Sequence, residues 1–150
     1  MIAMLMAAAL ATEDCVVVGD SLAVGVGEAV NRQVTGTSCR IAARRGEPAS
    51  RIRRTMGPVD ADVAIVSAGA NDAASPTLTY DLQAIRSSIR ARQVIWLLPK
   101  DRRAAAAARA VCLQAGDVAV DLLGYASDDG IHPRDYRLVS RQAFRTMTCG

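Results

Sequence analysis

Short runs of apolar, mostly β-branched residues alternate with longer helix-like stretches along most of this chain, and no other feature limits its fold as strongly. The first run, residues 15–18 (Cys-Val-Val-Val), ends at Gly19 and is continuously apolar, as is typical of a buried parallel strand. Four similar runs follow, at residues 38–43, 62–67, 94–98 and 118–122. The stretches expected to be helical are 22–34, 48–56, 76–92, 101–115 and 136–147. Strands separated by helices need crossover connections, so the sequence predicts an α/β fold, a three-layer α/β/α sandwich around a five-stranded parallel sheet.

Length and composition fit one domain of this kind. The chain has 150 residues and no Pro-, Gly- or Ser-rich linker divides it, so residues 12–150 are expected to form a single domain. Hydrophobic residues make up 51% of the chain but aromatic residues only 3%, so Val, Ile, Leu and Ala must build the core. These side chains suit buried strands that are covered by helices.

The first eleven residues form a separate apolar segment. Residues 1–11 end Ala9-Leu10-Ala11, which is similar to the apolar region and cleavage site of a secretory signal peptide. No Lys or Arg precedes Arg32, so the positive start of a signal peptide is missing. We expect the segment to be the remnant of a signal peptide, with a short packed helix as the alternative. It is too short to span a bilayer, which takes roughly 20 apolar residues.

The four cysteines support export. Cys15, Cys39, Cys112 and Cys149 show no C-x-x-C spacing, so no zinc site is expected, and they allow three pairings. The first two fall on the first two predicted strands and the other two on later helices, so we expect the disulfides Cys15–Cys39 and Cys112–Cys149. Such bonds form in oxidising compartments, so the protein is expected to be secreted or periplasmic. The alternative is a cytosolic protein with four buried free thiols.

Polar residues follow the predicted strands at the points where these end. Ser21 lies just after the first strand, Gly46 after the second, Asn71 after the third, and Asp129 and His132 after the fifth. In an open parallel sheet, ligands bind outside the carboxyl ends of the strands, so these residues are expected at one rim. A hydroxyl, an amide side chain, flexible backbone amides, a carboxylate and an imidazole are together the groups needed for acyl transfer to serine.

These residues occur in motifs that resemble those of the SGNH/GDSL hydrolase family. The first block is VVVGDSL at residues 16–22, the third is GAND at 69–72, similar to the family's GxND, and the last is DGIH at 129–132, similar to its DxxH. They appear in the family's order and span nearly the whole chain. Gly46 stands at the place of the second block. The resemblance implies a flavodoxin-like SGNH hydrolase fold and a serine esterase.

The resemblance also implies a role for each residue. Ser21 would attack the acyl carbon, and Asp129 would hold the ring of His132 in the correct tautomer. A serine hydroxyl needs a base to take its proton, and His132 is the only histidine in the chain. By analogy with the family, the backbone amides of Ser21 and Gly46 and the side chain of Asn71 would form the oxyanion hole. This chemistry needs no metal or other cofactor, and none is expected.

Each motif taken alone has a structural interpretation. Asp20 or Ser21 can cap a helix, Asn71-Asp72 and Asp129-Gly130 are turn sequences, and Pro133 can begin a helix. The combination of all motifs, in order and at strand ends, favours the functional interpretation. Asp72 is expected to be local scaffolding of its loop rather than a catalytic acid.

Other function classes fit less well. A dinucleotide site needs G-x-G-x-x-G directly after the strand, whereas Gly19 is followed by five other residues before Gly25. A P-loop needs Gly-Lys-Ser/Thr, which the chain lacks. Two alternatives to an esterase stay open, namely an acyltransferase that uses the same site and a non-catalytic, carbohydrate-binding relative.

Chain length and charge indicate the kind of ester. A short chain implies short loops and a shallow pocket, so short acyl groups such as acetyl are expected, on a polysaccharide or lipid carrier. The net charge of +3 is too small for a nucleic-acid binder, and no nucleic-acid partner is expected. A group of arginines around Gly46 is expected either to face an anionic carrier or to form a solvated helix face. It consists of Arg40, Arg44, Arg45, Arg51, Arg53 and Arg54.

Overall fold

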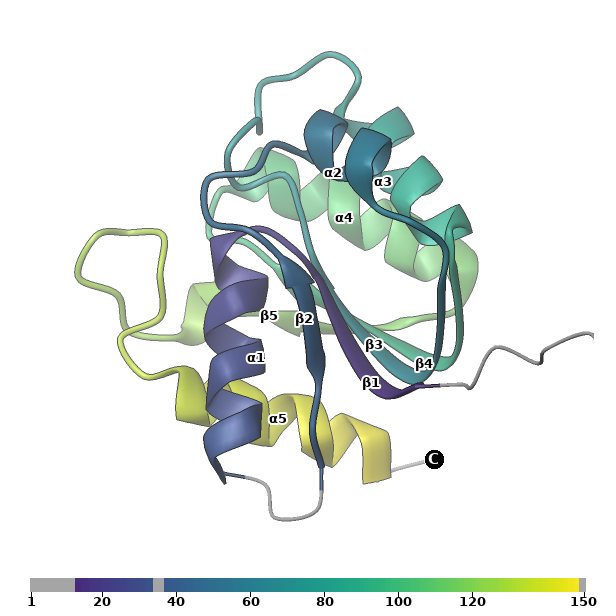
Figure 1. The fold of residues 1–150 in the computed structure, drawn as a ribbon. Coiled ribbons are helices and arrows are strands. Elements are labelled where there is room, and N and C mark those ends of the chain that lie inside the picture. Colours follow the sequence, from purple (N-terminus) through teal and green to yellow (C-terminus); the bar gives the residue numbers. More distant parts are fainter. Residues whose placement is uncertain (1–12, 34–36, 149–150) are drawn as a thin grey trace, which may run out of the picture.

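Five parallel strands form one sheet at the centre of the molecule (Figure 1). The computed structural model describes residues 13–33 and 37–148. The strands are β1 (Glu13–Gly19), β2 (Arg40–Ala43), β3 (Val59–Ser67), β4 (Ile89–Leu98) and β5 (Val118–Asp121). Their order is β2-β1-β3-β4-β5, and all neighbours pair in parallel. The predicted five-stranded parallel α/β fold, with its flavodoxin-like strand order, is therefore confirmed.

Helices cover both faces of this sheet (Figure 1). Two of them, α1 (Ser21–Gln33) and α5 (Tyr136–Thr148), lie on one face. The other face carries α2 (Ala49–Thr55), α3 (Leu78–Ser87) and α4 (Arg102–Ala115). A short 3-10 helix, η1 (Leu122–Gly124), follows β5. Within residues 13–33 and 37–148, no helix is both long and apolar enough to cross a bilayer.

The side chains of β1 show why its sequence is apolar throughout. Val16 and Val18 face the layer of α2, α3 and α4, and Cys15 and Val17 face the layer of α1 and α5. All four residues are at most 3% exposed. Successive side chains of a strand point to opposite faces, so a strand that is covered on both sides must be apolar at every position.

The boundary between α3 and β4 differs from the expectation. The sequence predicts one helix over residues 76–92, but α3 ends at Ser87 and β4 begins at Ile89. β4 pairs with β3 from its first residue, where the buried Ile89 lies beside Val59. Apolar and polar residues alternate from Ile89 to Arg92, so burial of every second side chain outweighs the helical propensity of the arginines.

One of the two predicted disulfides is confirmed. Cys15 on β1 is bonded to Cys39, which directly precedes β2. The predicted Cys112–Cys149 bond is not formed, because Cys112 is a buried free thiol, and Cys149 lies outside the described residues. Cys112 packs into the layer of α2, α3 and α4, whereas α5 packs on the opposite face, so the sheet stands between them. The expected signal-peptide remnant at residues 1–11 also lies outside the described residues.

We expect the Cys15–Cys39 bond to stabilise the fold by about 3 kcal/mol, because it joins residues with a sequence separation of 24. A Cys15→Ala/Cys39→Ala variant should unfold at a lower urea concentration than the oxidised wild type. Dithiothreitol should lower the urea midpoint of the wild type and leave that of the double variant unchanged. A wild-type midpoint that does not respond to reduction contradicts the prediction.

Candidate active site

Main-chain hydrogen bonds tie together the ends of β1, β2 and β3. Arg44 N donates to Gly19 O at 3.0 Å, and Asp20 N donates to Ser67 O at 3.0 Å. The loops that follow these three strands therefore start beside one another at the carboxyl rim of the sheet. In an open parallel sheet this rim is where ligands bind.

Ser21 lies at this rim as the first residue of α1. Its Oγ is 2.8 Å from Nε2 of His132, although the two residues are 111 positions apart in the chain. The hydroxyl also stands at the N-terminal end of a helix, where the helix dipole stabilises negative charge. The structure thus joins the first and the last motif through one hydrogen bond.

Asp20 shapes the turn between β1 and α1. It is fully buried, and its Oδ1 accepts a hydrogen bond from Leu22 N at 3.0 Å, which caps the first turn of α1. Burial raises the pKa of Asp20 to about 6. The sequence indicated a cap at either Asp20 or Ser21, and the structure assigns it to Asp20. The cap leaves the Ser21 hydroxyl available for His132.

Asp129 holds His132 from its other side. The Nδ1 atom of His132 is 2.6 Å from Asp129 Oδ2, and Asp129 Oδ1 accepts main-chain hydrogen bonds from Ile131 and His132, both at 2.8 Å. The hydrogen bonds from the side chain and backbone of His132 hold the pKa of Asp129 well below its usual range, so the carboxylate is ionised. An ionised carboxylate only accepts hydrogen bonds, so Nδ1 donates and Nε2 is left to accept from Ser21.

The loop that carries His132, residues 125–135, is anchored at both ends. Lys100 Nζ donates a hydrogen bond to Tyr125 O at its start. Just after its end, the ring of Tyr136 packs so closely on Gly25 of α1 that a Cβ at Gly25 would be 2.4 Å from it. These two contacts hold the loop against the rest of the rim.

Gly46 and Asn71 are also brought together. Asn71 Nδ2 donates a hydrogen bond to Glu47 O at 3.1 Å, so the loop after β3 is joined to the residue that follows Gly46. Gly46 has a φ of +76°, which favours glycine, and no heavy atom lies within 4 Å of the position that a Cβ would take. The hydrogen bond to Glu47 had no signal in the sequence. It uses one hydrogen of the Asn71 amide and leaves the other for a ligand.

Asp72 takes part in the turn that follows Asn71. Its N–H donates to Gly69 O at 3.4 Å, and its carbonyl oxygen accepts from Ser75 N at 2.9 Å. Both carboxylate oxygens are enclosed and have no hydrogen-bond partner among the described residues. Among residues 13–33 and 37–148 as a whole, no group of three or more His, Cys, Asp or Glu side chains is placed to hold a metal ion.

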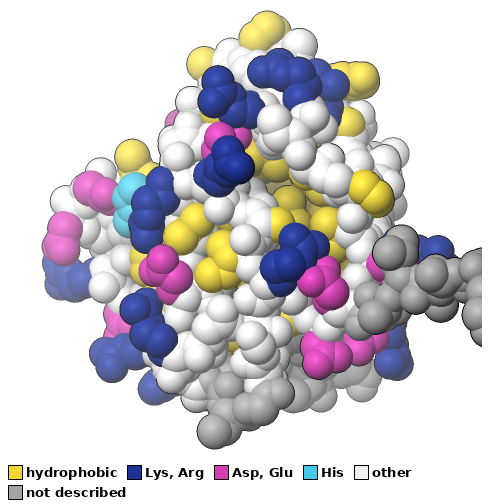
Figure 2. Space-filling model, in the orientation of Figure 1, with side chains coloured by type: hydrophobic (Ala, Val, Ile, Leu, Met, Phe, Trp, Pro, Cys, Tyr) yellow, Lys and Arg dark blue, Asp and Glu magenta, His cyan; other side chains and the backbone are white. Residues whose placement is uncertain are grey.

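The arginines around Gly46 do not form one continuous cationic surface, and Figure 2 shows basic and acidic side chains interspersed on this face. Four of the six are paired with carboxylates: Arg40 with Glu13, Arg45 with Glu28, Arg51 with Glu47 and Arg53 with Asp81. Arg44 and Arg54 form no ion pair with any residue that the structure describes.

Comparison with known proteins supports the fold. No protein-family model matches the sequence, and no curated protein matches it significantly. Solved structures do match. A GDSL-like lipase from Bacteroides uniformis has a TM-score of 0.66 at 12% identity, covering 92% of this chain and 97% of that one. A member of the lipolytic protein G-D-S-L family from Veillonella parvula has a TM-score of 0.64 at 16% identity, covering 91% and 99%.

A third solved structure is a transferase domain. The C-terminal catalytic domain of peptidoglycan O-acetyltransferase A from Streptococcus pneumoniae, solved with a methylsulfonyl adduct, has a TM-score of 0.62 at 12% identity. The match covers 92% of this chain and 94% of that domain. Identities this low show a common fold rather than a common substrate. The chain therefore has the SGNH/GDSL hydrolase fold that its motifs predicted.

Proposed function

We propose that this protein is a serine esterase that hydrolyses carboxylic esters with short acyl groups. The observation that carries the proposal is the hydrogen-bonded chain from Ser21 Oγ through both ring nitrogens of His132 to Asp129. A nucleophile, a base and an orienting carboxylate in this geometry are the parts of an acyl-transfer triad. The Cys15–Cys39 disulfide supports a secreted or periplasmic location, where such bonds persist.

In the first half of the reaction, Ser21 Oγ attacks the carbonyl carbon of the ester while His132 Nε2 takes the hydroxyl proton. The ionised Asp129 stabilises the imidazolium that forms and keeps the ring in place. His132 then returns the proton to the departing alkoxide oxygen, so the alcohol leaves and an acyl-enzyme remains. Water attacks the acyl-enzyme by the same steps, which releases the acid and restores Ser21.

Three donors would bind the oxyanion of the tetrahedral intermediates. These are the backbone amides of Ser21 and Gly46 and the Asn71 hydrogen that Glu47 does not use. The N-terminus of α1 adds its dipole to the Ser21 amide. Each preorganised donor of this kind is worth about 3 kcal/mol in the transition state.

The exposure of the proposed triad supports a preference for short acyl groups. The side chains of His132 and Asp129 are 37% and 52% exposed, so solvent reaches the site. An open site offers little apolar surface to a long acyl chain. We expect kcat/KM for p-nitrophenyl esters to be highest for the acetate or butyrate. A steady rise toward long acyl chains contradicts this expectation.

A fluorophosphonate probe tests the proposed function directly. The folded, oxidised protein should react covalently with the probe, and peptide mass spectrometry should place the adduct on Ser21. The same preparation should hydrolyse p-nitrophenyl acetate. If neither labelling nor turnover occurs, the proposal is overturned and a non-catalytic, carbohydrate-binding protein becomes the leading alternative.

The variant Asp129→Asn tests whether the Asp129 carboxylate orients the His132 ring. An amide can donate to Nδ1 and so stabilise the wrong tautomer of His132, and we expect kcat to fall on the order of 10²- to 10⁴-fold. Asp128→Asn is the matched control, because Asp128 is the neighbouring carboxylate and pairs with the exposed Arg134. It should keep kcat within about twofold of the wild type. If kcat falls equally in the two variants, Asp129 is not the orienting carboxylate and its place in the proposed triad is wrong.

Acyl transfer to an alcohol is the second candidate function. The observation that favours it is the open site, since a bulky acceptor can reach an exposed acyl-enzyme as readily as water can. The carrier would be a polysaccharide or a lipid. Product analysis with p-nitrophenyl acetate and an added sugar or alcohol separates the two functions. Acetylated acceptor that forms in preference to free acetate would identify a transferase.

A further inference from the structure

The loop that carries His132 projects from the body of the molecule between η1 and α5 (Figure 1). Its two ends are joined by a hydrogen bond of 2.7 Å from Arg134 N to Ala126 O. Among residues 126–134, Pro133 alone is buried. The loop is therefore braced mainly within itself, and its position relative to the sheet depends on the contacts at its ends.

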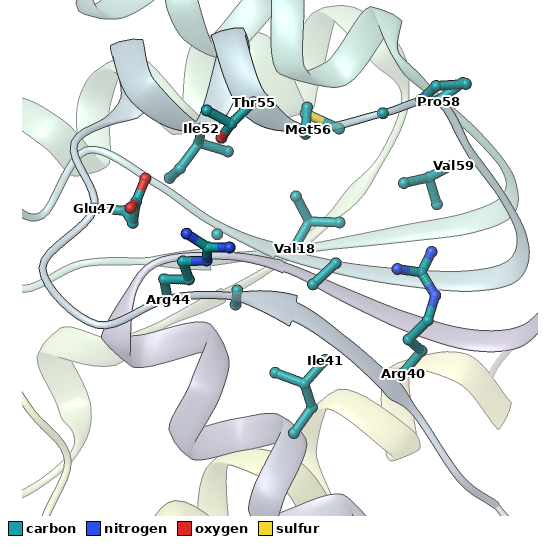
Figure 3. A pocket seen from close by; sticks show the side chains of 14 residues that line it. Val18, Arg40, Ile41, Arg44, Glu47, Ile52, Thr55, Met56, Pro58 and Val59 are labelled. Atoms are coloured by element: carbon teal, nitrogen blue, oxygen red, sulfur yellow. The ribbon is translucent and has the colours of Figure 1, made fainter.

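The loop on the other side of the rim is held directly by the sheet. Arg44 continues from β2, and its N–H donates to Gly19 O at the end of β1. Figure 3 shows Arg44 and Glu47 on the short connection from β2 to α2, and Glu47 O accepts the hydrogen bond from Asn71. By contrast, the main-chain hydrogen bonds of residues 126–134 to other described residues stay within the loop. A side chain has to supply the corresponding contact for the His132 loop.

Lys100 supplies this contact at the start of the loop. It follows Pro99, the first residue after β4, and its Nζ donates hydrogen bonds to Leu123 O, at 3.3 Å, and to Tyr125 O. The two carbonyl groups lie at the end of η1, where a helix leaves its last carbonyl groups without partners inside it. A lysine side chain near a helix end can donate to such groups. Lys100 thus joins the end of β4 to the residues that begin the loop.

The surroundings of Lys100 direct its ammonium group to these carbonyls. The nearby carboxylate of Asp121 is already paired with Arg102 and Arg109, each at 3.0 Å, and Lys100 forms no ion pair with a described residue. Arg102 also donates to Lys100 O at 3.0 Å and so holds its main chain. Lys100 is the only lysine in the chain. A compact ammonium group can donate to two carbonyls at one point, whereas the guanidinium fork suits a carboxylate.

We propose that Lys100 is a positioning residue for the proposed esterase reaction, because its ammonium group fixes the start of the loop that brings His132 to Ser21. The hydrogen bond of 2.8 Å between Ser21 Oγ and His132 Nε2 depends on where this loop lies. A displacement of about 1 Å in a reacting group can cost about 10²-fold in rate. The proposal rests on the proposed function and adds to it a residue that does not touch the substrate.

Lys100→Met tests the proposal, since methionine is a long, flexible side chain without a donor. For p-nitrophenyl acetate, kcat should fall about 10- to 100-fold while KM stays within about twofold, because the loop positions the base and not the ester. Arg103→Met is the matched control, since Arg103 is an exposed cation in the first turn of α4. It should keep kcat within about twofold of the wild type.

A chemical rescue separates the ammonium group from the packing of the side chain. Lys100→Cys should lose as much kcat as Lys100→Met does. Alkylation with 2-bromoethylamine creates a lysine analogue and should restore kcat to within about threefold of the wild type. Alkylation with iodoacetamide adds a neutral group and should restore much less. The wild type, treated with the same reagents, is the control for reaction at other cysteines, of which Cys112 is buried. Equal kcat after the two alkylations overturns the proposal.

Hydrogen exchange of main-chain amides measures the loop independently of activity. In Lys100→Met, the amides of Tyr125 and Arg134 should exchange faster than in the wild type, and those of β3 should exchange at the same rate. An active wild type whose exchange or kcat Lys100→Met leaves unchanged overturns the role of Lys100 alone. A wild type that hydrolyses no ester overturns the proposed function, and the role of Lys100 in catalysis fails with it.

Discussion

Replacing Ser21 with alanine should lower kcat/KM for p-nitrophenyl acetate by about 10⁴-fold or more, the largest effect on activity that we expect from one substitution. Alanine removes the only atom in this geometry that can form the acyl-enzyme, and His132 Nε2 then has no hydroxyl to deprotonate. The variant should also lose labelling by the fluorophosphonate. His132→Ala should cost about as much, because the members of a triad act as one unit and their losses do not add.

Ser87→Ala is the matched control for this variant. Ser87 is an exposed serine at the end of α3, where its hydroxyl donates to Gln83 O at 2.9 Å. It should keep the full rate and the full labelling. If Ser21→Ala retains activity within about tenfold of the wild type, the nucleophile is another group and the mechanism proposed here is wrong.

Gly19→Ala should have the largest effect on stability, a loss of more than about 4 kcal/mol, and we expect most of the protein to be unfolded or insoluble. Gly19 has a φ of +136°, and a Cβ there would lie 1.7 Å from the carbonyl oxygen of Ser67. That carbonyl accepts the hydrogen bond from Asp20 N, so it cannot move away without breaking this bond between the ends of β1 and β3. The same hydrogen bond helps to place Ser21 at the rim.

Gly57→Ala is the matched control, because it makes the same glycine-to-alanine change at a position with open space. A Cβ at Gly57 would meet no heavy atom within 4 Å. This variant should keep its free energy of unfolding within about 1 kcal/mol of the wild type, or gain slightly from the reduced freedom of the unfolded chain. Urea denaturation monitored by circular dichroism measures both variants. A Gly19→Ala protein that is as stable as Gly57→Ala would show that the close approach to Ser67 is not required.

The sheet was predictable because its inner strands are buried on both faces. Such a strand has to be apolar at every position, and the run at residues 15–18 shows this directly in the sequence. The start of β4 was not predictable in the same way. The alternation from Ile89 to Arg92 is short, and only pairing with β3 decided between helix and strand. Local propensity is weak there, so the neighbouring strand determined the result.

The pairing of the cysteines shows a similar division. Cys15 and Cys39 belong to two strand regions that become neighbours in the sheet, so their predicted elements already indicated the bond. Cys112 was expected to pair because of its place on a late helix. The sequence does not state on which face of the sheet a helix packs, and α4 lies on the face opposite α5. A disulfide needs its two residues within a few ångströms of each other, which only the tertiary structure can provide.

The sequence by itself determined which predicted strand each candidate residue follows, namely Ser21, Gly46, Asn71 and His132. It also determined that one histidine alone is available as the base. The tertiary structure alone decided that Ser21 Oγ and His132 Nε2 are 2.8 Å apart and that Glu47 O accepts a hydrogen bond from Asn71. The reason is physical. Periodicity and turn chemistry act between neighbours in the chain, whereas distances between loops depend on how strands pair and helices pack across the whole sheet.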